Sequence, residues 1–239
     1  MAALLAQQQF VATRQFLTAA DGGLYNSYSN GGRPEAVIEG LGNRWELEQI
    51  GLRLWPSATT IQGMITAMFT LVEKHGVSPD RARRLRISLG KTAVDMHGGF
   101  STYKGKFEAL LSAHYAASVI LHDRELSLAQ FEPERYNDPN LVRFAANQVE
   151  VTLDPTLVGS QALVEAETVD GSTIAVRCND PKGSPEDPLS RAEIEGKFRT
   201  YAKERLADSR IEEVLGIVSR LEELGSVRKL MQLLKLRQG

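Results

Sequence analysis

Cysteine is nearly absent from this sequence, because Cys178 is the only one among its 239 residues. A single thiol excludes a disulfide within the chain and offers no cysteine-based metal motif, so we expect a reducing compartment. No apolar run reaches the roughly 18 residues of a membrane span. Residues 1–20 contain Arg14 and three consecutive glutamines, which make them too polar for a signal peptide. We therefore expect a cytoplasmic protein that does not enter a membrane.

An excess of positive charge is also missing. Lysine and arginine number 28 against 30 aspartates and glutamates, which gives a formal net charge of -2. Nucleic-acid-binding domains usually carry a basic patch, so we expect no nucleic-acid partner. The chain also lacks a phosphate-binding glycine motif, metal-ligand spacing and a nucleophile elbow. We therefore expect chemistry without a cofactor or a metal.

The spacing of apolar residues predicts helices at both ends of the chain and a mixture of helices and strands between them. Helices are predicted over residues 2–20, 34–41, 57–74, 104–122, 139–147, 189–207, 209–224 and 226–236. Strands are predicted over residues 45–54, 84–94 and 148–153. Asp170-Gly171, between two alternating segments, predicts a β-hairpin over residues 161–177.

This order of elements predicts an α+β fold with three parts. Residues 1–41 are expected to form a helical segment and linker, residues 42–180 a mixed α/β middle domain, and residues 181–239 the C-terminal helices. The terminal helices carry wide apolar stripes. They either pack on one another and on the sheet, or complete a helical bundle supplied by another polypeptide.

Two segments of the middle domain place small polar or basic residues next to helix starts. In residues 55–62, Trp55 and Pro56 precede a helix whose first turn is expected to be capped by Ser57 or Thr59. Free amides and the helix dipole at such a start favour an anion. Residues 96–107 combine glycines with a tyrosine and two lysines ahead of another helix. The predicted residues for a small anionic ligand are Ser57, Thr59, Thr60, Gln62, Tyr103, Lys104 and Lys106.

Two histidines are the candidates for acid–base catalysis. His97 precedes two glycines at the expected end of a strand, from which it could reach a cleft, and His114 lies on an apolar helix face. Histidine titrates near neutral pH and is a frequent general acid or base. A lone histidine on an apolar helix face, such as His114, is more often a hydrogen-bonded core residue than a catalyst.

Several segments, taken in their order along the chain, resemble the MmgE/PrpD family. This family includes 2-methylcitrate dehydratase, cis-aconitate decarboxylase and iminodisuccinate epimerase. The resemblance rests on residues 2–10, 41–47, Arg53-Leu54-Trp55-Pro56-Ser57, 112–117, Phe131 with Asp138-Pro139, 149–155 and Gly196-Lys197-Phe198-Arg199. It covers nearly the whole chain but only the second half of the family proteins, which are usually about twice as long.

The resemblance implies half of a lyase or isomerase that acts on a small di- or tricarboxylate. The reaction would be cofactor-free proton abstraction, leading to dehydration, decarboxylation or epimerisation. The chain would supply a lid-like domain and closing helices. Most acid–base residues would come from a helical domain in a partner subunit or a homo-oligomer. Where the family commonly has a histidine this chain has Gln62, which cannot titrate.

Two other functions are compatible with the same residues. The chain could be a self-sufficient enzyme that uses His97 or His114 with the help of a lysine. Alternatively, it could be a non-catalytic, lid-like binding or interaction module. A gene that encodes only the missing helical half would favour the two-part enzyme over both.

Overall fold

The computed structural model describes residues 1–30 and 32–235, and the chain divides into two compact units, Met1–Gln49 and Ile50–Gly239. The first unit contains two short α-helices and two 3-10 helices, and nearly all of its described residues are exposed. Their bounds are α1 (Ala2–Gln7), α2 (Leu24–Tyr28), η1 (Pro34–Val37) and η2 (Glu46–Gln49).

Two predictions for the first part of the chain are wrong. The helix predicted over residues 2–20 ends at Gln7, because α1 buries none of its residues and a six-residue helix without packing is barely stable. The strand predicted over residues 45–54 does not form. Its apolar side chains, such as Trp45 and Leu47, are exposed, so no burial stabilises an extended backbone there.

The second unit is built on a four-stranded sheet with the strand order β2-β1-β3-β4. The strands are β1 (Ala82–Leu89), β2 (Val149–Leu153), β3 (Ala162–Thr168) and β4 (Thr173–Cys178). β1 is parallel to β2 and antiparallel to β3, and β3 and β4 form the hairpin predicted around Asp170-Gly171. Gly171 has φ +84, the left-handed conformation that such a turn requires.

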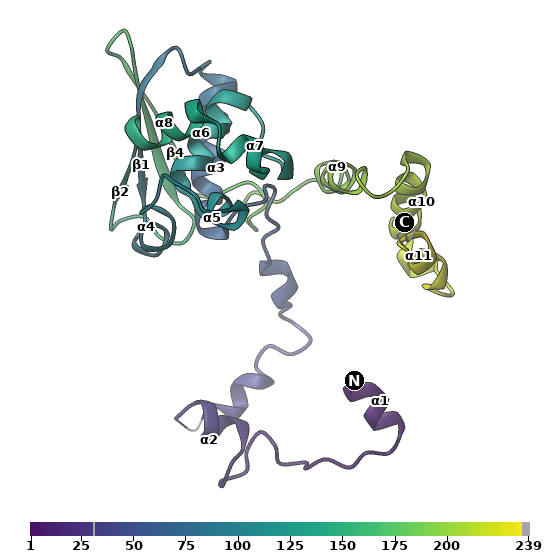
Figure 1. Cartoon of the computed structure of the whole chain (residues 1–239). Coiled ribbons are helices and arrows are strands. Elements are labelled where there is room, and N and C mark those ends of the chain that lie inside the picture. Colours follow the sequence, from purple (N-terminus) through teal and green to yellow (C-terminus); the bar gives the residue numbers. More distant parts are fainter. Residues whose placement is uncertain (31, 236–239) are drawn as a thin grey trace. The chain divides into compact units, whose positions relative to one another are not determined.

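Three helices, α3, α6 and α8, lie against the apolar face of this sheet (Figure 1). Their bounds are α3 (Gln62–Lys74), α6 (Ala113–Asp123) and α8 (Pro139–Asn147). Buried side chains such as Met68 on α3 and Tyr115 on α6 meet Ile87 and Val164 of the sheet in one hydrophobic core. The α+β fold class is therefore confirmed, and α8 matches its predicted range.

Shorter elements connect these layers and follow them. Their bounds are η3 (Thr59–Ile61), α4 (Lys91–His97), α5 (Lys106–Leu111), η4 (Leu128–Phe131), α7 (Pro133–Tyr136), α9 (Arg191–Ala202), α10 (Asp208–Val218), η5 (Leu221–Glu223) and α11 (Arg228–Leu233). The three closing helices are shorter than predicted, and the predicted end at residue 236 lies outside the described residues. Within the described ranges, no helix has the length and apolar character needed to cross a membrane.

Two predicted elements in the middle of the chain are interrupted. The helix predicted over residues 104–122 breaks at Ser112, whose backbone is extended and whose hydroxyl accepts the Tyr115 N–H to cap α6. The strand predicted over residues 84–94 ends at Leu89. Gly90 follows it because a Cβ there would lie 2.4 Å from the Leu157 carbonyl oxygen, and α4 begins at the next residue.

Candidate functional site

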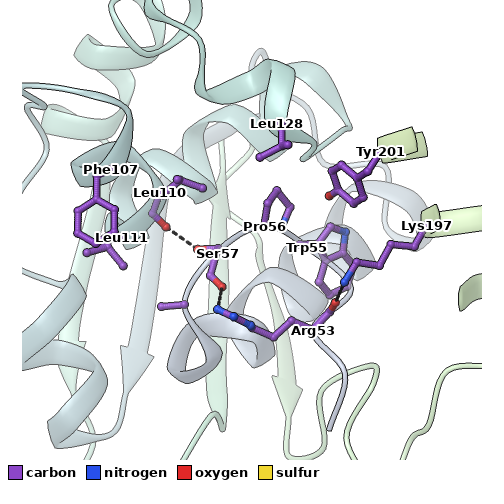
Figure 2. A pocket seen from close by; sticks show the side chains of 11 residues that line it. Arg53, Trp55, Pro56, Ser57, Phe107, Leu110, Leu111, Leu128, Lys197 and Tyr201 are labelled. Atoms are coloured by element: carbon purple, nitrogen blue, oxygen red, sulfur yellow. Dashed lines mark hydrogen bonds between the residues drawn. The ribbon is translucent and has the colours of Figure 1, made fainter. Parts of the chain in front are cut away.

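The candidate site is a cavity of about 420 Å³ in the second unit (Figure 2). It is formed by the segment that precedes α3, by α5 with η4, and by α9. The lining residues are Arg53, Trp55, Pro56, Ser57, Ala58, Phe107, Leu110, Leu111, Leu128, Lys197 and Tyr201. None of these described lining residues is acidic. The cavity therefore has cationic and apolar walls but no carboxylate of its own.

Gln62 fixes the shape of the segment before α3 rather than facing this cavity. Its side chain is only 2% exposed, and Nε2 donates to the carbonyl oxygens of Trp55, Ser57 and Ala58 at 3.3 to 3.4 Å. The Trp55 ring also stacks on Phe69, with ring centroids 5.0 Å apart. These contacts hold one wall of the cavity in a single conformation.

The predicted side-chain cap at this helix start does not form. Neither η3 nor α3 begins with a side-chain cap. The Ser57 hydroxyl instead donates to the Leu110 carbonyl oxygen at 2.7 Å, as Figure 2 shows. This bond ties the segment before α3 to α5, which lies 53 residues further along the chain. Because its proton is already donated, the hydroxyl can only accept a further hydrogen bond.

Two cationic side chains, Arg53 and Lys197, line the cavity, and each donates to a main-chain carbonyl oxygen. Arg53 Nη1 donates to the Ser57 carbonyl oxygen at 3.0 Å, and the Lys197 ammonium donates to the Arg53 carbonyl oxygen. Burial, and then the neighbouring Arg53 guanidinium, lower the pKa of Lys197. A bound carboxylate would act in the opposite direction, because an anion stabilises the protonated amine. The wall around Lys197 is therefore suited to hold an anion.

Tyr201 lies one helical turn beyond Lys197 on α9 and also lines the cavity. Burial, and then the Glu125 carboxylate, raise the pKa of its hydroxyl. The hydroxyl therefore stays protonated at neutral pH and can donate a hydrogen bond.

Only one of the predicted ligand residues, Ser57, lines this cavity. Thr59 and Gln62 line a second, more polar cavity of about 350 Å³, which shares Arg53 with the first. Thr60 lies in η3, which packs against α4.

The residues predicted from the 97–106 segment line neither cavity. Tyr103 packs edge-on against Tyr115, with ring centroids 5.1 Å apart, and burial raises its pKa to about 12. Lys106 forms an ion pair with Glu132, and Lys104 is exposed. An anion site shared by residues 55–62 and 96–107 therefore stays a prediction, and the positions of these side chains do not favour it.

The two candidate histidines also lie outside the cavity. His97 is at the end of helix α4 and not at a strand end, and it is 0% exposed. Both of its ring nitrogens, and Nδ1 of the half-buried His114, lack a hydrogen-bond partner among the described residues. Burial lowers the pKa of each imidazole, and for His97 it outweighs the opposing effect of the nearby Leu111 backbone, so both are neutral at pH 7. Their catalytic roles stay predictions.

The sequence interpretation missed Arg53, Lys197 and Tyr201 as site residues. Arg53 and Lys197 both belong to segments that carry the family resemblance, but neither segment alone indicates that they meet. A usable signal was the i, i+4 spacing of Lys197 and Tyr201, which places both on one helix face. Within residues 1–30 and 32–235, no group of three His, Cys, Asp or Glu side chains could hold a metal ion.

Comparison with known proteins places the chain in a family. The MmgE/PrpD C-terminal domain matches residues 55–223, more than half of the chain. The chain therefore belongs to the MmgE/PrpD family, as the resemblance predicted.

Three relatives illustrate the relationship. The chain is 26% identical over 253 residues to a cis-aconitate decarboxylase from Aspergillus terreus, which covers 97% of this chain and 51% of the relative. It is 27% identical over 226 residues to cis-aconitate decarboxylase from Mus musculus, and this match covers 90% of this chain and 45% of the relative. It is 31% identical over 132 residues to cis-aconitate decarboxylase from Homo sapiens, and this match covers 54% of this chain and 27% of the relative. The chain thus spans about half the length of the curated relatives that it matches along most of its sequence.

Proposed function

We propose that this chain works as the C-terminal half of a carboxylate lyase of the MmgE/PrpD type. The observation that carries the proposal is that Arg53 and Lys197 both line a cavity without acidic lining, next to and within the family segment. Two cations in a partly apolar cavity bind a carboxylate more strongly than they would in water, because the local dielectric constant is lower. In this proposal the cavity holds a carboxylate of a small di- or tricarboxylate.

The side chains of the cavity have distinct roles in such a reaction. Arg53 and Lys197 hold and orient the carboxylate, and the Tyr201 hydroxyl donates to an oxygen that gains negative charge. The apolar walls exclude water and so strengthen these interactions. Since the named relatives are decarboxylases, loss of carbon dioxide is the reaction we favour over dehydration and epimerisation.

The acid and the base of the reaction are assigned to a helical half outside this chain. The described lining of the cavity contains no imidazole and no carboxylate. Loss of carbon dioxide leaves an electron pair on carbon that a positioned acid must protonate, and the proton abstraction of the alternative reactions needs a positioned base. The relatives are about twice as long as this chain, which leaves room for such a half. We place it on a helical partner subunit or, less simply, on a second copy of the chain.

An apolar groove between α9 and α10 is the observation that supports a partner chain. Ile194, Phe198, Val214 and Val218 line it, and Ile194 and Val218 are exposed. Burial of apolar surface contributes roughly 25 cal/mol per Å², so covering this groove favours association. Exposed apolar patches of this kind mark interaction sites.

The proposal is tested by joining the two halves. The chain is co-expressed with a polypeptide that carries only the helical half of the family, and assembly and turnover of cis-aconitate and other polycarboxylates are measured. We expect turnover from the assembled pair and little from the chain alone. Arg53→Gln and Lys197→Gln should each lower kcat/KM by about tenfold or more, since a charge-assisted hydrogen bond contributes about 1.5–3 kcal/mol. Lys203→Gln, at the exposed end of α9, is the matched control.

Two results would overturn it. Efficient turnover by the chain alone would show that no helical half is required. Assembly without turnover of any polycarboxylate, together with unimpaired binding of these acids, would favour the non-catalytic binding module. That alternative has one observation in its support, the lack of an acid–base pair in the described lining.

A further inference from the structure

The first unit, Met1–Gln49, carries many apolar side chains but has no core of its own. The exposed fraction is 64% for Phe10, 57% for Phe16 and 59% for Trp45. Among the described residues of this unit only Gly23 is buried, and glycine has no side chain that could form a core. The large apolar side chains of the first unit therefore face water when the chain is alone.

The composition of residues 1–30 is not that of a solvated tail. Sixteen of these thirty residues are apolar, and only Arg14 and Asp21 are charged. Segments that stay disordered in solution usually combine low hydrophobicity with high charge. Large exposed apolar patches on soluble proteins instead mark interaction sites. Residues 1–30 therefore have the composition of a segment that is covered by a partner.

The match to a relative indicates which partner covers the first unit. The MmgE/PrpD C-terminal domain begins only at residue 55, yet the match to the Aspergillus terreus relative covers 97% of this chain. Most of residues 1–54 therefore has a counterpart that precedes the C-terminal domain of the relative. The match covers 51% of the relative, and because the matched domain is the C-terminal one, the other half of the relative lies before this counterpart. In the relative, the counterpart of the first unit thus joins the half that this chain does not contain.

We infer that the first unit is the segment by which this chain binds the helical half. Its large apolar side chains, Phe10, Phe16 and Trp45 among them, are buried against that half, and the unit becomes ordered as it binds. A second copy of the chain is a poorer partner, because it contains the same half again. The inference rests on the proposed function, since it takes the helical half as the partner, and it names the part of the chain that recognises this partner.

The test is hydrogen exchange of the full chain, measured alone and after co-expression with the helical half. In the chain alone, the amides of residues 1–49 should exchange at the earliest times, because regions with few buried contacts open readily. In the assembled pair we expect these amides to exchange about tenfold more slowly or slower still. The amides of β1 and β3 should exchange at the same rate in both samples.

Variants locate the contact. Phe10→Ser and Phe16→Ser should each weaken assembly about tenfold or more, because a buried phenylalanine side chain is lost from the interface. Val169→Ser is the matched control: Val169 is 68% exposed but belongs to the second unit, beside the turn of the β3–β4 hairpin. It should leave assembly unchanged. All three variants should keep the urea transition of the wild-type chain, since none of these side chains belongs to the hydrophobic core.

The outcomes separate this inference from the proposed function. An active pair in which residues 1–49 still exchange rapidly, or in which both phenylalanine variants assemble like the wild-type chain, would overturn the inference and leave the proposed function standing. Assembly with protection of residues 1–49 but without turnover of any polycarboxylate would support the inference and count against the lyase. Protection that appears in the chain alone would overturn the inference. If this protection rises with protein concentration, a second copy covers the unit. If the two halves do not assemble, both proposals fail.

Discussion

Gln62 and His97 are both buried polar side chains, but their surroundings differ. Both the oxygen and the nitrogen of the Gln62 side-chain amide have hydrogen-bond partners. Its burial therefore stabilises one conformation of the cavity wall. His97 has no partner among the described residues for either ring nitrogen. A buried group without partners costs about 1–3 kcal/mol, so this imidazole is expected to limit stability rather than to perform chemistry.

The pH dependence of stability should report this burial. Because burial holds the pKa of His97 below its ordinary 6.5, the unfolded chain binds more protons than the folded chain just below that pH. The free energy of unfolding is therefore fully retained above pH 6.5 and falls as the pH is lowered. His97→Phe should reduce this loss, by up to about 1.4 kcal/mol per pH unit, in urea denaturation at pH 7.5 and 5.5.

Tyr103→Phe is the matched control, since it removes another buried group without a partner but leaves the imidazole. It should change the stability at both pH values equally. His114, whose pKa burial also lowers, accounts for the part of the pH dependence that remains. The same difference between pH 7.5 and 5.5 in His97→Phe and in the wild-type chain would contradict this account.

At the scale of secondary-structure elements, the correct predictions are those that rest on a local sequence motif. The hairpin at Asp170-Gly171 and the helix over residues 139–147 formed as predicted, because turn chemistry in one and Pro139 after Asp138 in the other specify them directly. The strand predicted over residues 45–54 has apolar residues too, but no neighbouring strand pairs with it. Strand formation depends on such partners, which periodicity does not reveal.

The loop between β4 and α9 positions Arg53. The Leu52 N–H donates to the Gly183 carbonyl oxygen at 2.7 Å. Gly183 has φ +92, and a Cβ there would lie 1.9 Å from the Leu52 carbonyl oxygen. Any side chain at this position must therefore move the segment that carries Arg53.

Gly183→Ala should lower the free energy of unfolding by about 2 kcal/mol or more, through the left-handed backbone and the close contact. It should also weaken carboxylate binding. Gly196→Ala is the control, because a Cβ in that helical position meets open space; it should be stabilising by about 0.5–1 kcal/mol. Chemical denaturation measures both, and a Gly183→Ala variant as stable as the wild-type chain would contradict the positioning role.

At the scale of the whole molecule, the two units differ in how much they bury. Nearly all described residues of the first unit are exposed, whereas the second contains the hydrophobic core. Regions with few buried contacts open most easily to proteases. Limited proteolysis should therefore cut within residues 1–49 first and leave a protected fragment that begins near Ile50. Early cuts inside the β3–β4 hairpin would contradict this.

The site is a property of the folded molecule more than of any local pattern. Ser57 was predicted because its motif is local, but Lys197 lies 144 residues after Arg53, and their contact exists only in the folded chain. His97 and Lys106 carry suitable chemistry in sequence, yet the fold buries the first and pairs the second with Glu132. Residue type led to the prediction of an anionic ligand, and tertiary packing decided which residues line the cavity.

Trp55 offers the most direct measurement of whether the cavity binds a carboxylate. The chain has two tryptophans, and Trp45→Phe leaves Trp55, in the cavity wall, as the only one. Titration of this variant with a carboxylate should give a saturable change in tryptophan emission, weakened about tenfold or more when Lys197→Gln is added and unaffected by Lys203→Gln. An emission that does not change with carboxylate, or a change that is equal in the Lys197→Gln variant, would contradict the assignment of this cavity.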